Sequence, residues 1–177
     1  MINNSNKKKI TLFLLVVTII CIMVMKTFNK PLVNNVCKGG VISFELAKDL
    51  DCSEKIINSW NENAKLNMSL SLGFDFLFLL VYSSFIALLI FNINNKLWKS
   101  KPFYKVGKLL IYAIFIAAFF DVIENIALIK LLLGDLKQIW SSIAYYFATI
   151  KFIIVLICII YLLFSWSTLL FKKEKLV

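Results

Sequence analysis

Residues 117–125 read AAFFDVIEN and lie in the middle of a long apolar segment, 106–133. Asp121, Glu124 and Asn125 fall at positions i, i+3 and i+4, so a helix places them on one face. The length and apolarity of the segment predict a helix that crosses a lipid bilayer. Because a carboxylate in hydrocarbon carries a large free-energy cost, these residues indicate a functional site.

The composition of the whole chain also indicates a membrane protein. The chain has 177 residues, of which 60% are hydrophobic, and its mean hydropathy is +0.83. Soluble domains contain only about 45–50% apolar residues. We therefore predict an all-α membrane protein, a single integral membrane domain over 1–177 with four transmembrane helices in a bundle. The expected spans are about 10–28, 69–92, 106–133 and 139–171.

The distribution of charge predicts the topology. All twenty basic residues are lysines, and the net charge is +10. The excess lies in three lysine-rich segments that flank apolar runs, at 7–9, 96–108 and 172–175. Cytoplasmic loops carry such an excess. We therefore expect a multi-pass protein of the cell membrane with both termini cytoplasmic, and we expect no nucleic-acid partner.

The long loop, residues 29–68, is expected on the outer side because its acids and lysines balance. It should contain an amphipathic helix capped by Ser53, whose apolar stripe is Ile56, Ile57, Trp60 and Ala64. A shorter helix around 42–50 precedes it, with Glu45 and Asp49 on a shared face. Together they predict a short extracytoplasmic helical cap.

Local signals predict where the long helices end. Pro31 should stop the first span. Gly134 suits the C-terminus of the third span, and Asp135 with Gln138 is expected to form a capping pair that opens the fourth.

Helical geometry brings further polar residues toward the central carboxylates. Asp75 and Tyr82 share a face of the second span, and Lys151 lies on the polar face of the fourth. The rise per residue places the charged groups at similar depths, about 9 to 18 Å below the outer boundary. We predict one cluster of Asp75, Asp121, Glu124, Asn125 and Lys151, with Tyr82 and Tyr145 as neighbouring phenols.

The charges of this cluster suggest a function. Three carboxyl groups face one ammonium, so at least one of them should hold a proton at neutral pH unless a cation is bound. The favoured interpretation is a binding or transport protein whose site takes a proton, a cation or a cationic or lipid-like ligand. Its expected ligand-binding residues are Asp121, Glu124, Asn125, Asp75, Lys151 and Tyr82.

Two other interpretations stay open. The cluster could lock four helices in register in a structural or accessory subunit of a membrane complex. It could instead serve a membrane-embedded lipid-modifying enzyme as an acid–base pair, which would need an apolar tunnel beside the carboxylates. No catalytic motif occurs, so an enzyme is less favoured. We expect no cofactor and no metal; expected partners are membrane lipids and a second copy or a partner subunit.

Four cysteines complete the set of reactive groups. Cys37 and Cys52 both lie in the outer loop, where a disulfide is permitted. They are a disulfide candidate, and two unpaired thiols are the alternative.

Overall fold

The computed structural model describes residues 4–174, and this part of the chain is helical with no strand. Its elements are α1 (Asn4–Asn29), the short 3-10 helix η1 (Lys30–Leu32), α2 (Val41–Glu45), α3 (Leu50–Asn58), α4 (Glu62–Leu97), α5 (Tyr104–Leu132) and α6 (Gln138–Glu174). Four segments are long and apolar enough to cross a membrane: Asn6–Leu32, Glu62–Leu97, Tyr104–Leu132 and Gln138–Phe171. Lys175, part of the predicted C-terminal lysine segment, lies outside the described residues.

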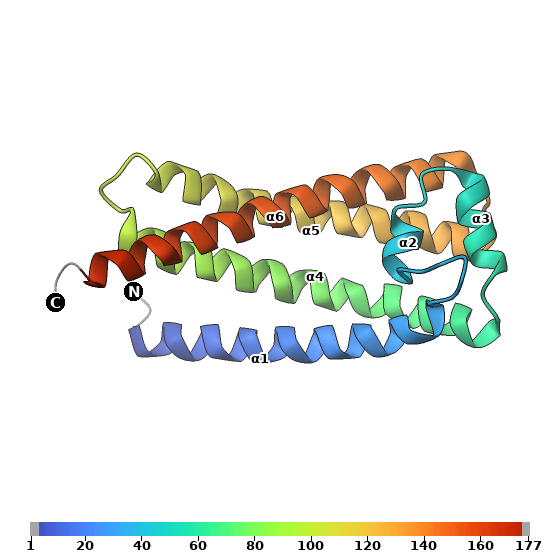
Figure 1. The fold of residues 1–177 in the computed structure, drawn as a ribbon, viewed down its shortest axis with the longest axis horizontal. Coiled ribbons are helices and arrows are strands. Elements are labelled where there is room, and N and C mark those ends of the chain that lie inside the picture. The colour runs from blue at the N-terminus through green and yellow to red at the C-terminus, as the bar shows by residue number, and fades with distance from the viewer. Residues whose placement is uncertain (1–3, 175–177) are drawn as a thin grey trace.

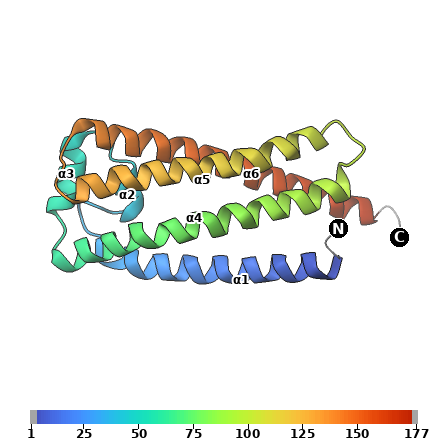
Figure 2. The ribbon, with the colours of Figure 1, turned by 180° about the vertical axis from the view of Figure 1, so that it is seen from behind.

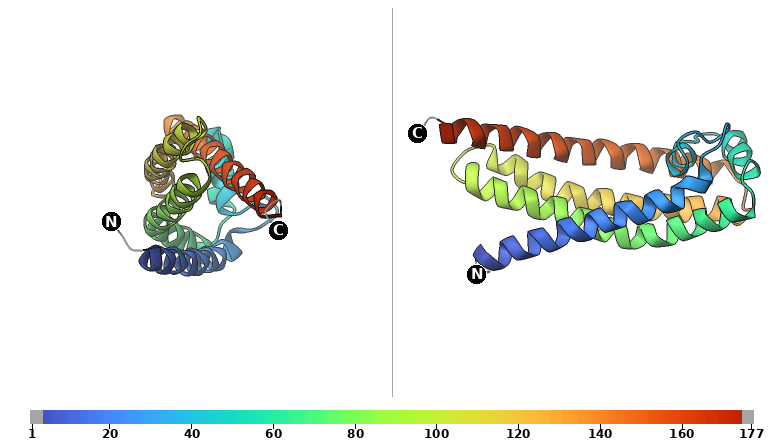
Figure 3. Two further views of the ribbon diagram at one scale, coloured as in Figure 1. Left: turned by 90° about the vertical axis from the view of Figure 1, so that its left-hand side faces the viewer. Right: turned by 60° about the horizontal axis from the view of Figure 1, so that its bottom comes forward.

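The long helices form a bundle in which α5 packs along both α4 and α6, while α1 packs along α4. Figures 1 and 2 show α2 and α3 at one end of this bundle and the α4–α5 connection at the other. We call these the α2–α3 end and the α4–α5 end. Helices α1 and α6 lie apart from each other at the α4–α5 end (Figure 3).

The segment between α1 and α4 is part of the core. Helix α2 packs against α5 and α6, and α3 packs against α6. Trp60 joins the two parts of the segment, because its Nε1 donates to the Leu32 carbonyl oxygen at 3.0 Å and its ring lies edge-on to Phe44 at 5.3 Å. Leu32 and Phe44 are fully buried. This packing fixes α2 against the bundle.

The helices of this segment begin elsewhere than predicted. Helix α3 begins at Leu50, so Ser53 is not its cap; Ser53 is buried, and its hydroxyl pairs with that of Ser141 on α6 at 2.9 Å. Ala64 belongs to α4, which begins at Glu62 and not at 69. The Asn61 side chain caps α4 by accepting from the Ala64 N–H at 2.9 Å. The start of α4 is therefore set by the Asn61 cap, although the apolar stripe continues across this position.

The α5–α6 connection confirms one predicted signal and corrects another. Gly134 ends α5 with a φ of +92°. The Gly134 and Asp135 N–H groups donate to the carbonyl oxygens of Leu131 and Lys130, which is the Schellman arrangement. Asp135 and Gln138 do not form a capping pair: the Asp135 carboxylate accepts from Trp140 Nε1. Gln138 instead donates to the Lys48 carbonyl oxygen just before α3 and accepts from the N–H of Leu50, the first residue of α3.

The two cysteines of the predicted disulfide are free thiols in the structure. Cys37 is fully buried beside Leu32 and Phe44, and its Sγ donates to the Gly40 carbonyl oxygen at 3.2 Å. Cys52 is on the exposed side of α3. The two side chains therefore face different environments, and burial raises the pKa of the Cys37 thiol above its ordinary value.

A second polar network closes the α4–α5 end. Asn94 on α4 donates to the Tyr104 carbonyl oxygen at 3.1 Å and accepts from the Tyr161 hydroxyl of α6 at 3.0 Å. Trp98 Nε1 donates to the Ser165 hydroxyl at 3.0 Å. Gly107 on α5 makes room for this network, because a Cβ there would overlap the Asn94 side chain and the Tyr161 hydroxyl.

We therefore predict that Gly107→Ala lowers the stability of the protein. The added methyl group must displace buried hydrogen-bonded side chains, and overpacking of this kind costs about 1–3 kcal/mol. Gly73→Ala is the matched control, since a Cβ at Gly73 in α4 meets nothing within 4 Å. Thermal unfolding of both purified variants in detergent measures the difference. Equal midpoints for the two variants would contradict the packing described above.

Candidate functional site

The centre of the polar cluster is an ammonium group shared by two carboxylates. Lys151 Nζ on α6 lies 2.9 Å from Asp121 Oδ1 and 2.7 Å from Glu124 Oε2. All three side chains are buried, and Glu124 is 0% exposed. Asp121 and Glu124 lie one helical turn apart on α5, so a single long side chain from α6 reaches both.

Small residues explain why α5 and α6 approach so closely here. Ala117 on α5 and Ala144 and Ala148 on α6 are fully buried. Small side chains let helix backbones pack closely, which brings the polar groups of both helices into contact. The stretch of sequence that holds the carboxylates therefore also supplies the space for their partner.

Helix α4 completes the predicted set. The Tyr82 hydroxyl donates to Asp121 Oδ2 at 2.9 Å, and Asn125 Nδ2 donates to Asp75 Oδ2 at 2.7 Å. The structure thus brings together all six residues singled out from the sequence: Asp75, Tyr82, Asp121, Glu124, Asn125 and Lys151. Tyr145, expected nearby, packs instead against Tyr146, and the Lys48 ammonium lies 5.8 Å from its ring centre.

A fourth carboxyl group, Glu45, joins the cluster from α2, and it was not among the cluster residues predicted from the sequence. Glu45 is only 9% exposed. The Asn29 side chain helps to hold α2 in place by accepting from the Val41 N–H at 2.8 Å. The only signal in the sequence was that Glu45 shares a helical face with Asp49, but Asp49 is exposed. Periodicity within a five-residue helix could not indicate which of the two would be buried.

Several oxygens of the cluster lack a hydrogen-bond donor within the described part of the chain. They are Glu45 Oε2 and both carboxylate oxygens of Glu124, although Glu124 Oε2 is in ionic contact with Lys151. Burial raises the pKa of Glu45 above its ordinary value, and the Lys151 ammonium opposes this shift. The cluster therefore has acceptor capacity that the protein itself does not satisfy.

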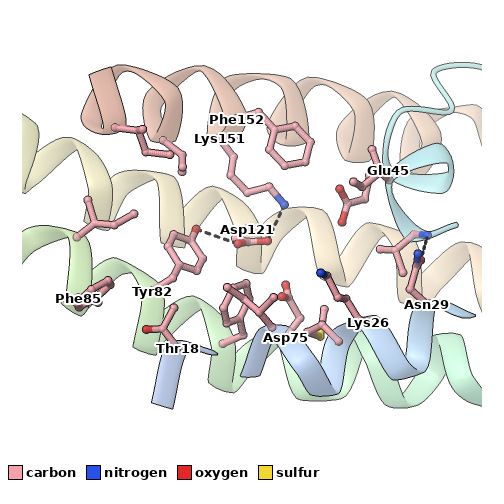
Figure 4. A pocket seen from close by; sticks show the side chains of 18 of the residues that line it. Thr18, Lys26, Asn29, Glu45, Asp75, Tyr82, Phe85, Asp121, Lys151 and Phe152 are labelled. Carbon is pink, nitrogen blue, oxygen red and sulfur yellow. Dashed lines mark hydrogen bonds and ion pairs between the residues drawn. The ribbon is translucent and has the colours of Figure 1, made fainter. Parts of the chain in front are cut away.

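A pocket of about 610 Å³ begins at this cluster. Figure 4 shows Glu45, Asp75, Asp121 and Lys151 around the same space, with Lys26 of α1 beside it. Most of the remaining lining is apolar and comes from α1, α4 and α6. It includes Ile22, Phe78, Phe85, Ile86, Leu89, Phe152, Val155, Ile159 and Leu162. The site is therefore a pocket with one charged end and long apolar walls.

No protein-family model, curated protein or solved structure matches the chain. The chemistry of the site is therefore inferred from its own groups. Within residues 4–174 no group of three or more cysteine, aspartate or glutamate side chains is arranged to hold a metal ion. The side chains present are carboxyl, amide, phenol and ammonium groups, which exchange protons and bind positive charge.

We predict that Lys151→Met destabilises the protein strongly, because it leaves two buried carboxyl groups without their cation. Breaking a buried pair in this way costs about 3–5 kcal/mol. The triple variant Lys151→Met/Asp121→Asn/Glu124→Gln removes the partners as well and should recover most of the loss. Chemical unfolding in detergent compares the variants.

Lys130→Met is the control for this experiment. Lys130 is an exposed lysine in the last turn of α5, so its loss should change stability little. A Lys151→Met protein as stable as the Lys130→Met protein would show that the pairing does not hold the helices together.

We also predict that Glu45→Gln flattens the pH dependence of stability. Because the pKa of Glu45 is raised in the folded state, its contribution to stability is complete below the ordinary glutamate pKa of about 4.3 and is lost as pH rises through the folded-state value. The variant should therefore gain stability relative to wild type as the pH rises above the ordinary glutamate pKa. Thermal unfolding between about pH 4.5 and 8.5 measures this difference.

Glu62→Gln is the matched control, because the Glu62 side chain is 93% exposed. It should keep the wild-type pH dependence. If Glu45→Gln behaves in the same way, the buried environment of Glu45 does not control its ionisation.

Proposed function

We propose that the chain is an integral membrane protein that crosses the bilayer four times, with α1, α4, α5 and α6 as the spans. The long helices expose large apolar side chains on their outer faces, such as Leu109, Phe119 and Leu163, which suit contact with lipid. The lysines of the α4–α5 connection support a cytoplasmic position for that end and for both termini. In this orientation α2 and α3 form an extracytoplasmic cap.

We further propose that the protein binds positive charge at the buried cluster, either as a proton or as the cationic group of a ligand. The observation that carries this proposal is the imbalance of the cluster. Glu45, Asp75, Asp121 and Glu124 meet a single buried ammonium, Lys151, and Glu45 Oε2 has no donor among the described residues. A buried carboxylate without a partner is unfavourable, so protonation or a bound cation stabilises the site.

The contacts suggest different roles for two pairs of carboxyl groups. Asp121 and Glu124 are the partners of Lys151 and fix the position of its ammonium. Glu45 and Asp75 both line the pocket and are not among the ion-pair partners of Lys151. We therefore assign the direct contact with a ligand to Glu45 and Asp75, while Tyr82 and Asn125 orient Asp121 and Asp75.

A second candidate function is favoured by the pocket. A lipid-modifying enzyme needs an apolar space beside its acid–base groups, and the lining beyond the carboxyl groups is mostly apolar. In that case the pair Glu45 and Asp75 would donate and accept protons on a bound lipid. Turnover of a lipid substrate, lost in Glu45→Gln and dependent on pH, would distinguish this function from simple binding.

The test of the binding function is ligand-induced stabilisation. Purified wild-type protein is heated at several pH values with sodium, potassium, magnesium, calcium or methylammonium ions. We expect at least one cation, or acidification itself, to raise the unfolding midpoint saturably. A ligand at one hundred times its Kd adds about 2.7 kcal/mol of stability. Glu45→Gln should lose this effect, and Glu62→Gln should keep it.

The opposite result would favour a structural role. If no cation acts and Glu45→Gln responds to pH as wild type does, the cluster does not bind positive charge. The ion pairs between α5 and α6 would then serve only to lock the helices of a structural or accessory subunit.

A further inference from the structure

Residues that line the pocket lie along three helices, α1, α4 and α6, and extend from the α2–α3 end toward the α4–α5 end. On α4 its lining runs from Asp75 through Phe78, Tyr82 and Phe85 to Leu89, and on α6 from Lys151 through Val155 and Ile159 to Leu162. On α1 it runs from Asn29 through Lys26 and Ile22 to Thr18. Each stripe has a charged residue near the α2–α3 end, and the stripes on α4 and α6 continue mainly with apolar residues. The spacings of three and four residues keep each stripe on one helical face.

The length of these stripes indicates how long a molecule the pocket can hold. From Lys151 to Leu162 the helix rises about 16 Å, and from Asp75 to Leu89 about 21 Å. The volume of about 610 Å³ lies in the range of sites that hold one small molecule. An elongated molecule with one polar end and one apolar chain matches both the length and the change in polarity.

The way into the pocket lies between α1 and α6. Both helices line it, and they lie apart from each other at the α4–α5 end (Figure 3). In the proposed membrane orientation this side faces the lipid chains. An apolar chain can therefore pass from the bilayer into the pocket without crossing water.

The charged end selects the head group. Glu45 Oε2 lacks a donor within the described residues, and Asp75 uses its Oδ2 to accept from Asn125. A primary ammonium group supplies both positive charge and N–H donors for the carboxyl groups of Glu45 and Asp75. A hydroxyl group has no charge, and a quaternary ammonium group has no N–H to donate.

We propose that the pocket binds one single-chain amphiphile with a primary ammonium head, the head between Glu45 and Asp75 and the chain along α4 and α6. This inference rests on the proposed function, since it names the class of cation that the carboxylates take. Beyond the proposed function, it states that the ligand carries an apolar chain, that it enters from the bilayer between α1 and α6, and that its head group is a primary amine.

The test uses protein reconstituted in phosphatidylcholine nanodiscs and dodecylamine as the probe. Binding is measured by competition against a fluorescent long-chain amine, and empty nanodiscs correct for partition into lipid. We expect dodecylamine to bind at least tenfold more tightly than dodecanol, dodecyltrimethylammonium or butylamine. Glu45→Gln should weaken dodecylamine at least tenfold, and Glu62→Gln should not.

Two neighbouring residues of α6 provide a matched pair for the chain. Ile159 lines the pocket and is 41% exposed, whereas Ile160 is outside the lining and 56% exposed. Neither is packed in the core, so tryptophan at either position leaves the fold intact. Ile159→Trp should weaken dodecylamine about tenfold and leave butylamine unchanged, and Ile160→Trp should affect neither.

The outcomes separate the two proposals. If butylamine binds as tightly as dodecylamine and Ile159→Trp equals Ile160→Trp, the site binds cations but the amphiphile inference is wrong. Equal binding of dodecyltrimethylammonium overturns the preference for a primary head. If dodecanol binds as tightly as dodecylamine and Glu45→Gln changes nothing, the cluster does not recognise charge, and both proposals fail.

Discussion

The ammonium of Lys151, held between two carboxyl groups of α5, is the constraint on which the rest of the structure depends. A buried lysine is tolerated only where oppositely charged partners surround it. Because Asp121 and Glu124 lie one turn apart, the ammonium fixes both the axial register and the facing surfaces of α5 and α6. Sliding α6 by one turn would separate it from one or both partners.

The same constraint determines where the proposed ligand would bind. Since the ion pairs of Lys151 go to α5, it forms none with the carboxyl groups that α2 and α4 bring to the pocket in the described part of the chain. Glu45 arrives on a helix of only five residues, held by contacts of Asn29, Trp60 and Phe44 and not by its own length. The segment between α1 and α4 therefore completes the site as well as closing one end of the bundle.

The sequence predicted the four long helices and the convergence of the polar faces of α4, α5 and α6, because both follow from helical periodicity. Asp75, Asp121 and Lys151 could be aligned by counting turns from a common boundary. Glu45 could not, because its position depends on tertiary contacts of a loop. The start of α4 was missed for a related reason: α3 ends at Asn58 and Asn61 caps α4, while the apolar stripe runs across the break between the two helices. Gly134 was predicted correctly because its role is purely local.

The peripheral position of α1 has a consequence for how such a pocket can diversify. Helices α5 and α6 hold the buried ion pairs and α4 adds hydrogen bonds to the cluster, whereas α1 packs along α4 and supplies one wall through Thr18 and Ile22. Substitutions on that wall alter the shape of the cavity without touching the Lys151 pairing. Natural substitutions on α1 can therefore change which molecules fit the pocket while the Lys151 ion pairs stay the same. Stability and ligand preference then depend on different helices.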